Sequence, residues 1–170
     1  MAHQFHPTSL REYDIRGIIG ETLGEEDAYA IGRGFGTLIG RAGGKSVAVG
    51  YDGRVSSPVL EAALVKGLND AGIGAVRVGM GPTPMLYYAE AVLDVDGGIQ
   101  ITGSHNPANY NGFKMVFQHR PFYGDDIQKL GAMAASGDWA EGAAGSESVD
   151  IIDRYVARLL EDFDGAAYRI

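Results

Sequence analysis

A serine, a histidine and a lysine lie close together in one turn-forming segment, ITGSHNPANYNGFKMV at residues 101–116. Gly103 frees the backbone to approach a ligand closely, and Ser104 is then presented at the tip of the loop. Lys114 follows on the returning strand, from which its cation can reach back toward the same tip. A hydroxyl beside cations suits nucleophilic or phosphoryl-transfer chemistry, because cations stabilise charge on the transferred oxygens.

A structural explanation of the same segment stays open. Gly, Asn and Pro usually turn the chain around, and Asn106 beside a proline can close such a turn through side-chain bonds. Side chains of adjacent residues usually diverge, so Ser104 and His105 are not expected to form a catalytic pair. The sequence TGSHNP also lacks the G-x-S-x-G pattern of the hydrolases. The spacing alone therefore indicates a candidate anion-handling loop.

Two further loops carry candidate residues. Tyr13 and Arg16 lie in YDIRG at residues 13–17, and Asp52 and Arg54 lie in GYDGRVSS at residues 50–57. Loops that follow the carboxyl ends of strands in an α/β sheet are where ligands bind. Asp52 and Arg54 could also pair simply to hold a loop. A third glycine-rich stretch, GRGFG at residues 32–36, lacks the G-x-G-x-x-G spacing, so close helix packing is favoured over a dinucleotide site.

Composition excludes several classes of protein. The formal charge of −8 argues against a sequence-independent nucleic-acid binder, which needs a basic face. With no cysteine, disulfides and thiolate chemistry are excluded. His3, His6 and His119 have no metal-ligand partners at useful spacing. The sequence shows no signal-peptide h-region and no apolar run of ~20 residues, so we expect a cytoplasmic protein with no membrane partner.

Strands alternate with helices along the chain, which predicts a three-layer α/β/α sandwich with a mixed, largely parallel sheet. Ser56 or Ser57 is expected as the N-cap of the second helix. Thr83 is expected as the N-cap of the third. Strands are expected at residues 11–19, 46–50, 73–79, 95–101 and 112–117, and helices at 24–41, 57–71, 83–93 and 124–136.

The last part of the chain differs in composition. GDWAEGAAGSES at residues 137–148 is small and polar, which is typical of a linker. An amphipathic helix is expected after it, with an apolar stripe that needs a neighbour to pack against. The stripe comprises Ile152, Tyr155, Val156, Leu159, Leu160 and Phe163. We expect an α/β domain at residues 1–140, followed at residues 141–170 by a linker and a helix leading toward a second domain.

Three motifs together resemble one family. TGSHNPANYNGFK at residues 102–114 resembles the phosphoserine loop of the α-D-phosphohexomutases, the phosphoglucomutase/phosphomannomutase family. REYDIRG at residues 11–17 and VGYDGRVSSP at residues 49–58 resemble that family's earlier signatures in the same order. The resemblance covers about the first 140 residues, and it implies interconversion of hexose 1-phosphate and hexose 6-phosphate through a 1,6-bisphosphate.

The resemblance also implies residue roles. Ser104 would carry the phosphoryl group, and its phosphate would ligate Mg²⁺, which acts as a Lewis acid. Lys114 would be a charge stabiliser or acid/base partner, and Arg16 would be a further catalytic residue that lines the same cleft. Tyr13, His105 and Asn106 would line the cleft or touch phosphate, whereas Asp52 and Arg54 would support the loop. Hexose phosphates would be the substrates, and glucose 1,6-bisphosphate the activator or intermediate.

This sequence also departs from the family's pattern. Members have four domains, and the aspartate-rich Mg²⁺ loop D-G-D-x-D-R of the second domain does not occur here. The chain therefore resembles an isolated first domain, for which we expect little or no turnover alone. The alternatives are a non-catalytic phosphosugar- or phosphate-binding module and a serine phosphatase.

Overall fold

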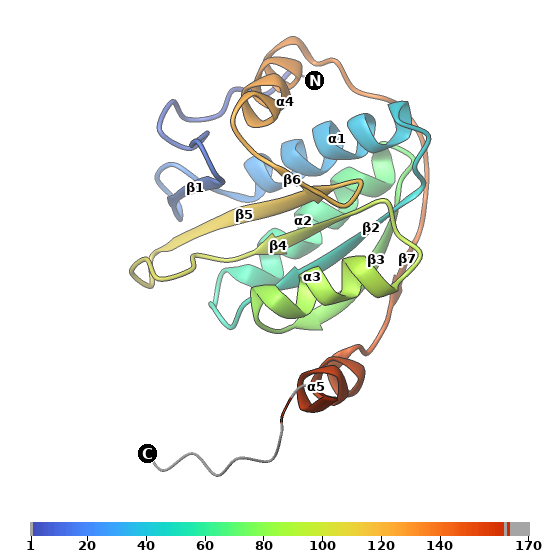
Figure 1. The fold of residues 1–170 in the computed structure, drawn as a ribbon. Helices are drawn as coiled ribbons and strands as arrows, with labels where there is room; N and C mark the ends of the chain where they lie inside the picture. Colours follow the sequence, from blue (N-terminus) through green and yellow to red (C-terminus); the bar gives the residue numbers. More distant parts are fainter. Residues whose placement is uncertain (1, 162, 164–170) are drawn as a thin grey trace.

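Strands and helices alternate in the computed structural model, which describes residues 2–161 and 163 (Figure 1). Among these residues there are seven strands and five helices. The strands are β1 (Ile15–Ile18), β2 (Ser46–Tyr51), β3 (Gly74–Met80), β4 (Gly97–Ile101), β5 (Tyr110–Phe117), β6 (Arg120–Phe122) and β7 (Ser146–Ser148). The helices are α1 (Glu25–Arg41), α2 (Ser57–Asp70), α3 (Thr83–Val92), α4 (Asp125–Ser136) and α5 (Ile152–Glu161).

The described strands form one mixed sheet in the order β1-β5-β4-β2-β3-β7, with β6 pairing β5. The pairs β4–β2, β2–β3 and β3–β7 are parallel, whereas β1–β5, β5–β4 and β5–β6 are antiparallel. The expected α/β sandwich with a mixed sheet is confirmed. Its parallel part follows from helical crossovers, and its antiparallel part from the short return between β4 and β5.

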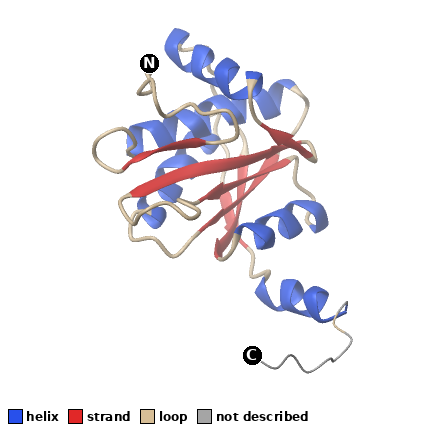
Figure 2. Ribbon diagram, turned by 60° about the vertical axis from the view of Figure 1, so that its left-hand side comes forward, coloured by secondary structure: helices blue, strands red, loops and turns tan. Residues whose placement is uncertain are grey.

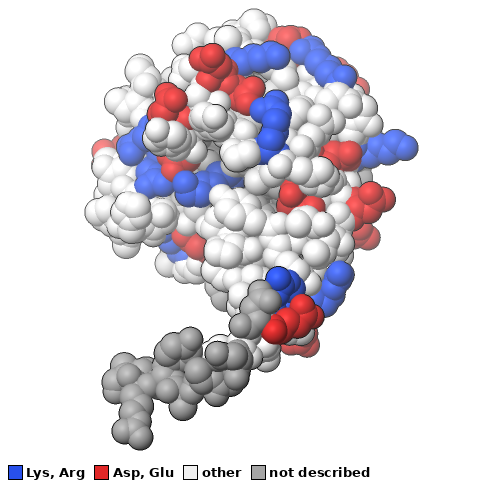
Figure 3. All heavy atoms as spheres, viewed as in Figure 1, with Lys and Arg blue, Asp and Glu red and all other residues white. Residues whose placement is uncertain are grey.

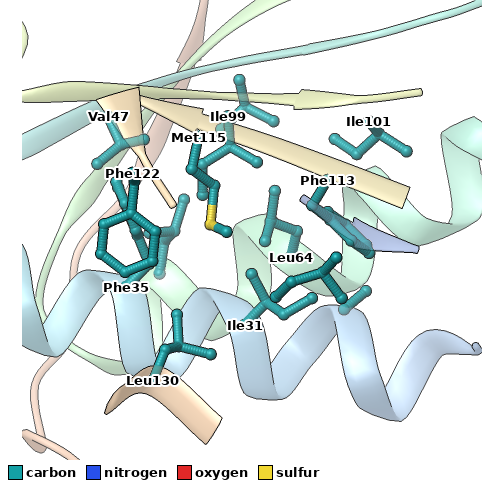
Figure 4. Close-up of a cluster of buried hydrophobic side chains, with 14 of the residues drawn as sticks. Ile31, Phe35, Val47, Leu64, Ile99, Ile101, Phe113, Met115, Phe122 and Leu130 are labelled. Carbon is teal, nitrogen blue, oxygen red and sulfur yellow. The ribbon is translucent and has the colours of Figure 1, made fainter. Parts of the chain in front are cut away.

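Helices cover both faces of the sheet (Figure 2). The larger core lies between the sheet and the helices α1, α2 and α4, where Phe35 and Leu64 pack on inward residues of β4 and β5 such as Ile99 and Phe113 (Figure 4). A smaller core lies on the other face, where Met85 and other residues of α3 pack against the sheet. Helix α3 packs chiefly on β2 and β4. The side chains of β1 and β5 on that face are thus available for a site.

Two glycines set how closely α1 and α2 pack. A Cβ at Gly32 would lie 2.2 Å from the carbonyl oxygen of Leu64, and a Cβ at Gly67 would lie 2.3 Å from that of Tyr29. Any side chain at either position would force the helices apart, because both clashes are with backbone. Gly32 belongs to the GRGFG stretch, so the prediction of close helix packing there is confirmed.

Several local predictions were wrong. The first strand begins at Ile15 rather than at residue 11, and Pro82 rather than Thr83 is the N-cap of α3. The segment expected to be only a linker contains β7, which pairs with β3 along the sheet edge. Strand β6 was not predicted. Both β6 and β7 have three residues, and such short edge strands carry too little alternation to be recognised from sequence.

Helix α5 presents an apolar stripe that its own domain leaves uncovered. Ile152, Val156, Leu159 and Leu160 are between 45% and 61% exposed, and no residue of α5 is buried. The ring of Tyr155 packs against the body of the domain, with its centroid 5.8 Å from that of Tyr88. Across the described residues, none of the helices is both long and apolar enough to cross a membrane.

Candidate active site

The loop that carries Ser104 joins two adjacent antiparallel strands, β4 and β5. The pairing continues one step beyond β4, since the Thr102 amide donates to the carbonyl oxygen of Gly112 at 2.9 Å. The loop therefore leaves the sheet on a rigid base and returns to the neighbouring strand. This places Ser104 beyond the carboxyl end of β4, at the sheet edge where α/β domains bind ligands.

Ser104 is exposed and has a left-handed backbone conformation, with φ of 53°. Its amide donates to the Thr102 hydroxyl at 2.8 Å, and its own Oγ lies 3.2 Å from Nδ1 of His105. The expectation that these neighbouring side chains diverge was wrong, since with a left-handed backbone at Ser104 the two groups lie within hydrogen-bonding distance. The structure thus joins a hydroxyl and an imidazole at the loop tip. In the described residues Ser104 Oγ has no hydrogen bond to Lys114.

Arg54 holds the loop from inside. Nη2 donates to the carbonyl oxygens of Ser104 and Asn106 at 3.1 and 2.7 Å. Nη1 donates to those of Pro107 and Tyr110 at 2.6 and 2.9 Å. With Nε donating to Asp52, all five N–H donors of the guanidinium are used. The loop is therefore built around one side chain, and Asn106 adds a bond from its own Nδ2 to the Gly103 carbonyl at 3.1 Å.

Asp52 anchors both Arg54 and the start of the loop. Its carboxylate accepts from the Ser57 hydroxyl at 2.6 Å and from the Gly103 amide at 3.1 Å. Burial acts to raise the pKa of Asp52, but these hydrogen bonds, with the one from Ser57 the strongest, hold it below its usual value. Asp52 is thus kept as a carboxylate, which is the form that can accept from every donor around it.

Gly103 has no room for a side chain. A Cβ at this position would lie 2.2 Å from Cζ of Arg54. The close approach of the Gly103 backbone to the guanidinium is what lets Arg54 reach the carbonyls on the far side of the loop. The glycine is therefore needed for packing against Arg54, in addition to any freedom it gives for approach by a ligand.

Two cations meet one carboxylate beside the loop. Both Nη2 of Arg16 and Nζ of Lys114 contact Oδ2 of Asp14, and the lysine contact measures 3.2 Å. Tyr13 is 74% exposed and stacks on Tyr123 with a centroid separation of 6.4 Å. Figure 3 shows Lys and Arg atoms gathered in the region where Figure 1 places β1 and β5. This cationic surface suits a phosphorylated ligand.

Some residues of this network were not singled out from sequence. Asn111 is fully buried and donates to the hydroxyls of Ser56 and Ser57, at 2.9 Å each. The serine hydroxyls therefore serve the network rather than capping α2, although Ser56 does occupy the N-cap position. The signal in the sequence was weak, because an Asn in a turn and a Ser before a helix both have common local explanations.

The fold and the site together define an α/β/α domain that presents a serine and nearby cations at the carboxyl edge of its sheet. Residues 7–141 match the model of the phosphoglucomutase/phosphomannomutase alpha/beta/alpha domain I. The chain belongs to the phosphoglucomutase/phosphomannomutase family.

Relatives agree with this assignment. A phosphomannomutase/phosphoglucomutase of Pseudomonas aeruginosa is 46% identical over 92% of this chain and 34% of its own length. A phosphomannomutase of Salmonella typhimurium is 43% identical over 90% of the chain and 34% of its own length. The crystal structure of a family protein from Burkholderia thailandensis superposes with a TM-score of 0.90 at 43% identity, covering 94% of this chain and 36% of that one. The chain spans about a third of the length of the relatives it matches.

Proposed function

We propose that this chain is the phosphoserine-bearing domain of an enzyme that interconverts hexose 1-phosphates and hexose 6-phosphates. Ser104 carries the phosphoryl group. One observation supports this most: Ser104 is exposed at the tip of a loop in which Arg54 holds four carbonyls, so the hydroxyl is rigidly presented. The family assignment and the Arg16 and Lys114 cations on strands β1 and β5 add to it.

In the proposed transfer, the bond between phosphorus and Ser104 Oγ breaks as a bond forms to a free hydroxyl oxygen of the hexose phosphate, and that hydroxyl gives up its proton as Oγ gains one. The product is a 1,6-bisphosphate, which returns its other phosphoryl group to Ser104 after turning over. Arg16 and Lys114 stabilise charge on the non-bridging oxygens. His105 lies within hydrogen-bonding reach of Oγ, which needs a proton when the phosphoryl group leaves. Tyr13 and Asn106 line the approach.

The residues described here do not by themselves fit a Mg²⁺ site. Mg²⁺ takes six oxygens in near-octahedral geometry, usually from carboxylates and phosphate. In the described part of the chain no three acidic or histidine side chains converge as a metal site. Asp52 is occupied by Ser57 and Arg54, and Asp14 by two cations. Phosphate on Ser104 would offer one ligand, so the carboxylates of a Mg²⁺ site would have to come from outside this domain.

The chain spans about a third of the relatives' length, which supports the proposal that this domain works together with further domains. We assign residues 1–140 to the phosphoserine domain and residues 141–170 to the connection toward a second domain. The uncovered stripe of α5 supports this division, because exposed apolar faces of this kind mark interaction surfaces. The cleft that selects the sugar would then form between Ser104 and the other domains.

Glucose 1,6-bisphosphate provides the test. After incubation with it, peptide mass spectrometry of the chain should find phosphate on Ser104, and the Ser104→Ala variant should take up none. Phosphate on Ser56 or Ser57 instead would contradict the assignment. Saturable binding of glucose 1,6-bisphosphate without any transfer would indicate a phosphosugar-binding module. Steady release of inorganic phosphate would indicate a phosphatase.

A further inference from the structure

Asp14, Arg16 and Lys114 form a cationic cluster, and Asp14 is its acidic member. Strand β1 pairs Ile15 with Phe113 and Arg16 with Gly112 in antiparallel register. Continuing that register by one residue places Asp14 opposite Lys114. Side chains alternate between the faces of a strand, so Asp14, Arg16 and Lys114 share one face while Ile15 and Phe113 enter the core. The cluster is thus fixed by strand pairing.

A single oxygen of Asp14 contacts both cations. The Asp14 and Arg16 side chains are 10% and 9% exposed, whereas Lys114 is 28% exposed and 3.2 Å from the carboxylate. Two cations placed side by side repel, and the repulsion is strong where water is scarce. The shared carboxylate offsets it. Without Asp14, we expect the repulsion to move the more exposed Lys114 side chain away from Arg16 and into solvent.

Most N–H donors of Arg16 and Lys114 are not used by Asp14. A guanidinium has five N–H donors and an ammonium three, and Asp14 accepts one from each. Nε of Arg16 is buried without a hydrogen-bond partner among the described atoms. The free donors face no second carboxylate in the described residues, so the cluster keeps a net charge of +1 with unused hydrogen-bonding capacity. An oxyanion of a phosphoryl group matches that capacity.

We propose that Asp14 is a positioning residue for phosphoryl transfer: it holds Arg16 and Lys114 together so that both act on the same transferred group. This rests on the proposed function of Ser104. Asp14 itself contacts neither phosphate nor sugar, and it acts through the two cations. Its negative charge does not help to attract an anion, so its benefit is geometric and should appear in the rate of transfer rather than in donor affinity.

The test uses the Asp14→Asn variant, which keeps the size of the side chain and removes its charge. With glucose 1,6-bisphosphate as donor, the maximal rate of Ser104 phosphorylation should fall by roughly 10–100-fold, since misplaced catalytic groups have effects of this size. The donor concentration at half-maximal rate should stay the same or fall. The matched control is Glu12→Gln, which removes the same charge from an exposed neighbour and should change neither value by more than about twofold.

The Asp14→Glu variant tests whether a restored carboxylate recovers part of the rate. The longer carboxylate restores the charge with a shifted position, so its maximal rate should lie between those of Asp14→Asn and the wild type. Equal maximal rates for Asp14→Asn and Glu12→Gln would overturn the proposal. So would a loss seen only as weaker donor binding. If Asp14→Asn fails to fold, Asp14→Glu decides the same question, because an unchanged maximal rate there would count against a geometric role.

A crystal structure of Asp14→Asn separates this inference from the proposed function. We expect Lys114 Nζ to move away from Arg16 while strands β1 and β5 stay paired. Unchanged positions of both cations would overturn the positioning role whatever the rates. Absence of phosphate on wild-type Ser104 would instead reject the proposed function, and the crystal structure would still decide whether Asp14 positions the cations.

Discussion

Arg54 donates a hydrogen bond to the carbonyl oxygen of Ser104 at 3.1 Å, although the two residues are fifty positions apart. The same guanidinium holds three other carbonyls of the loop and the carboxylate of Asp52. The position of Ser104 is thus set by a residue of the preceding β2–α2 connection. If Arg54 holds the loop, a substitution of Arg54 that preserves the fold should make the loop less ordered.

Replacing Arg54 with lysine should loosen the loop while retaining the charge. An ammonium cannot reproduce the planar fork that reaches five acceptors. Amide exchange at residues 103–110 should become faster, and the rate of Ser104 phosphorylation should fall by roughly 10–100-fold. Arg41→Lys is the matched control, since Arg41 is exposed and its side chain pairs with Asp138 at the surface. Unaltered exchange in Arg54→Lys would contradict the clamp.

Gly103→Ala tests the packing of the loop on Arg54. The new Cβ would lie 2.2 Å from the guanidinium carbon, so either the loop or Arg54 must move. We expect a loss of about 1–3 kcal/mol in the free energy of unfolding. Gly53→Ala is the control, because a Cβ there meets nothing closer than the sulfur of Met80 at 3.8 Å. Denaturant unfolding of both variants measures the difference, and equal losses would show that Gly103 is not sterically required.

The depressed pKa of Asp52 predicts a dependence of stability on pH. A carboxyl group whose pKa is lower in the folded protein stabilises the fold above its ordinary pKa of about 3.9, and this contribution is lost as the pH falls through the folded value. Asp52→Asn should therefore cost stability at neutral pH and progressively less below about pH 3.9. Urea unfolding at several pH values measures this. A penalty that stays constant with pH would show that the charge of Asp52 does not matter.

The apolar stripe of α5 predicts rapid local opening. Leu159 and Leu160 are exposed, whereas Leu64 and Leu68 of α2 are fully buried. Hydrogen exchange should be faster at Leu159 and Leu160 than at residues 59–69, because exposed helices open without disturbing the core. Equal protection in a monomer would mean that α5 packs on its own domain in solution.

We also expect that the unphosphorylated chain has no saturable Mg²⁺ site and that phosphorylated Ser104 binds the ion only weakly. Arg16 and Lys114 disfavour a lone divalent cation, and the nearby carboxylates are already engaged. An NMR titration that follows the amides of Gly103 and Ser104 measures this. Tight, saturable shifts without phosphate would show that Asp14 or Asp52 completes a metal site.

The sequence by itself determined the class of fold, and it singled out the candidate site residues. Helical spacing and buried strands are local patterns, and they placed α1, α2, α4 and the central strands within a few residues. The segment around Ser104 resembles a known phosphoserine loop over more than a dozen consecutive positions. A match of that length is more specific than the spacing of any two residues. That resemblance is what singled out Ser104, Arg16 and Lys114 as candidate site residues, and their roles stay predictions.

Only the tertiary structure decided how these residues meet. The register of β1 on β5 brings Asp14 opposite Lys114, although a hundred residues separate them. Arg54 reaches carbonyls that no local pattern connects to it, and Asn111 ties the loop base to the serines before α2. Strand β7 likewise forms by backbone pairing with β3, and its three residues are exposed. Such contacts depend on pairing between distant segments, and local sequence patterns carry no record of that pairing.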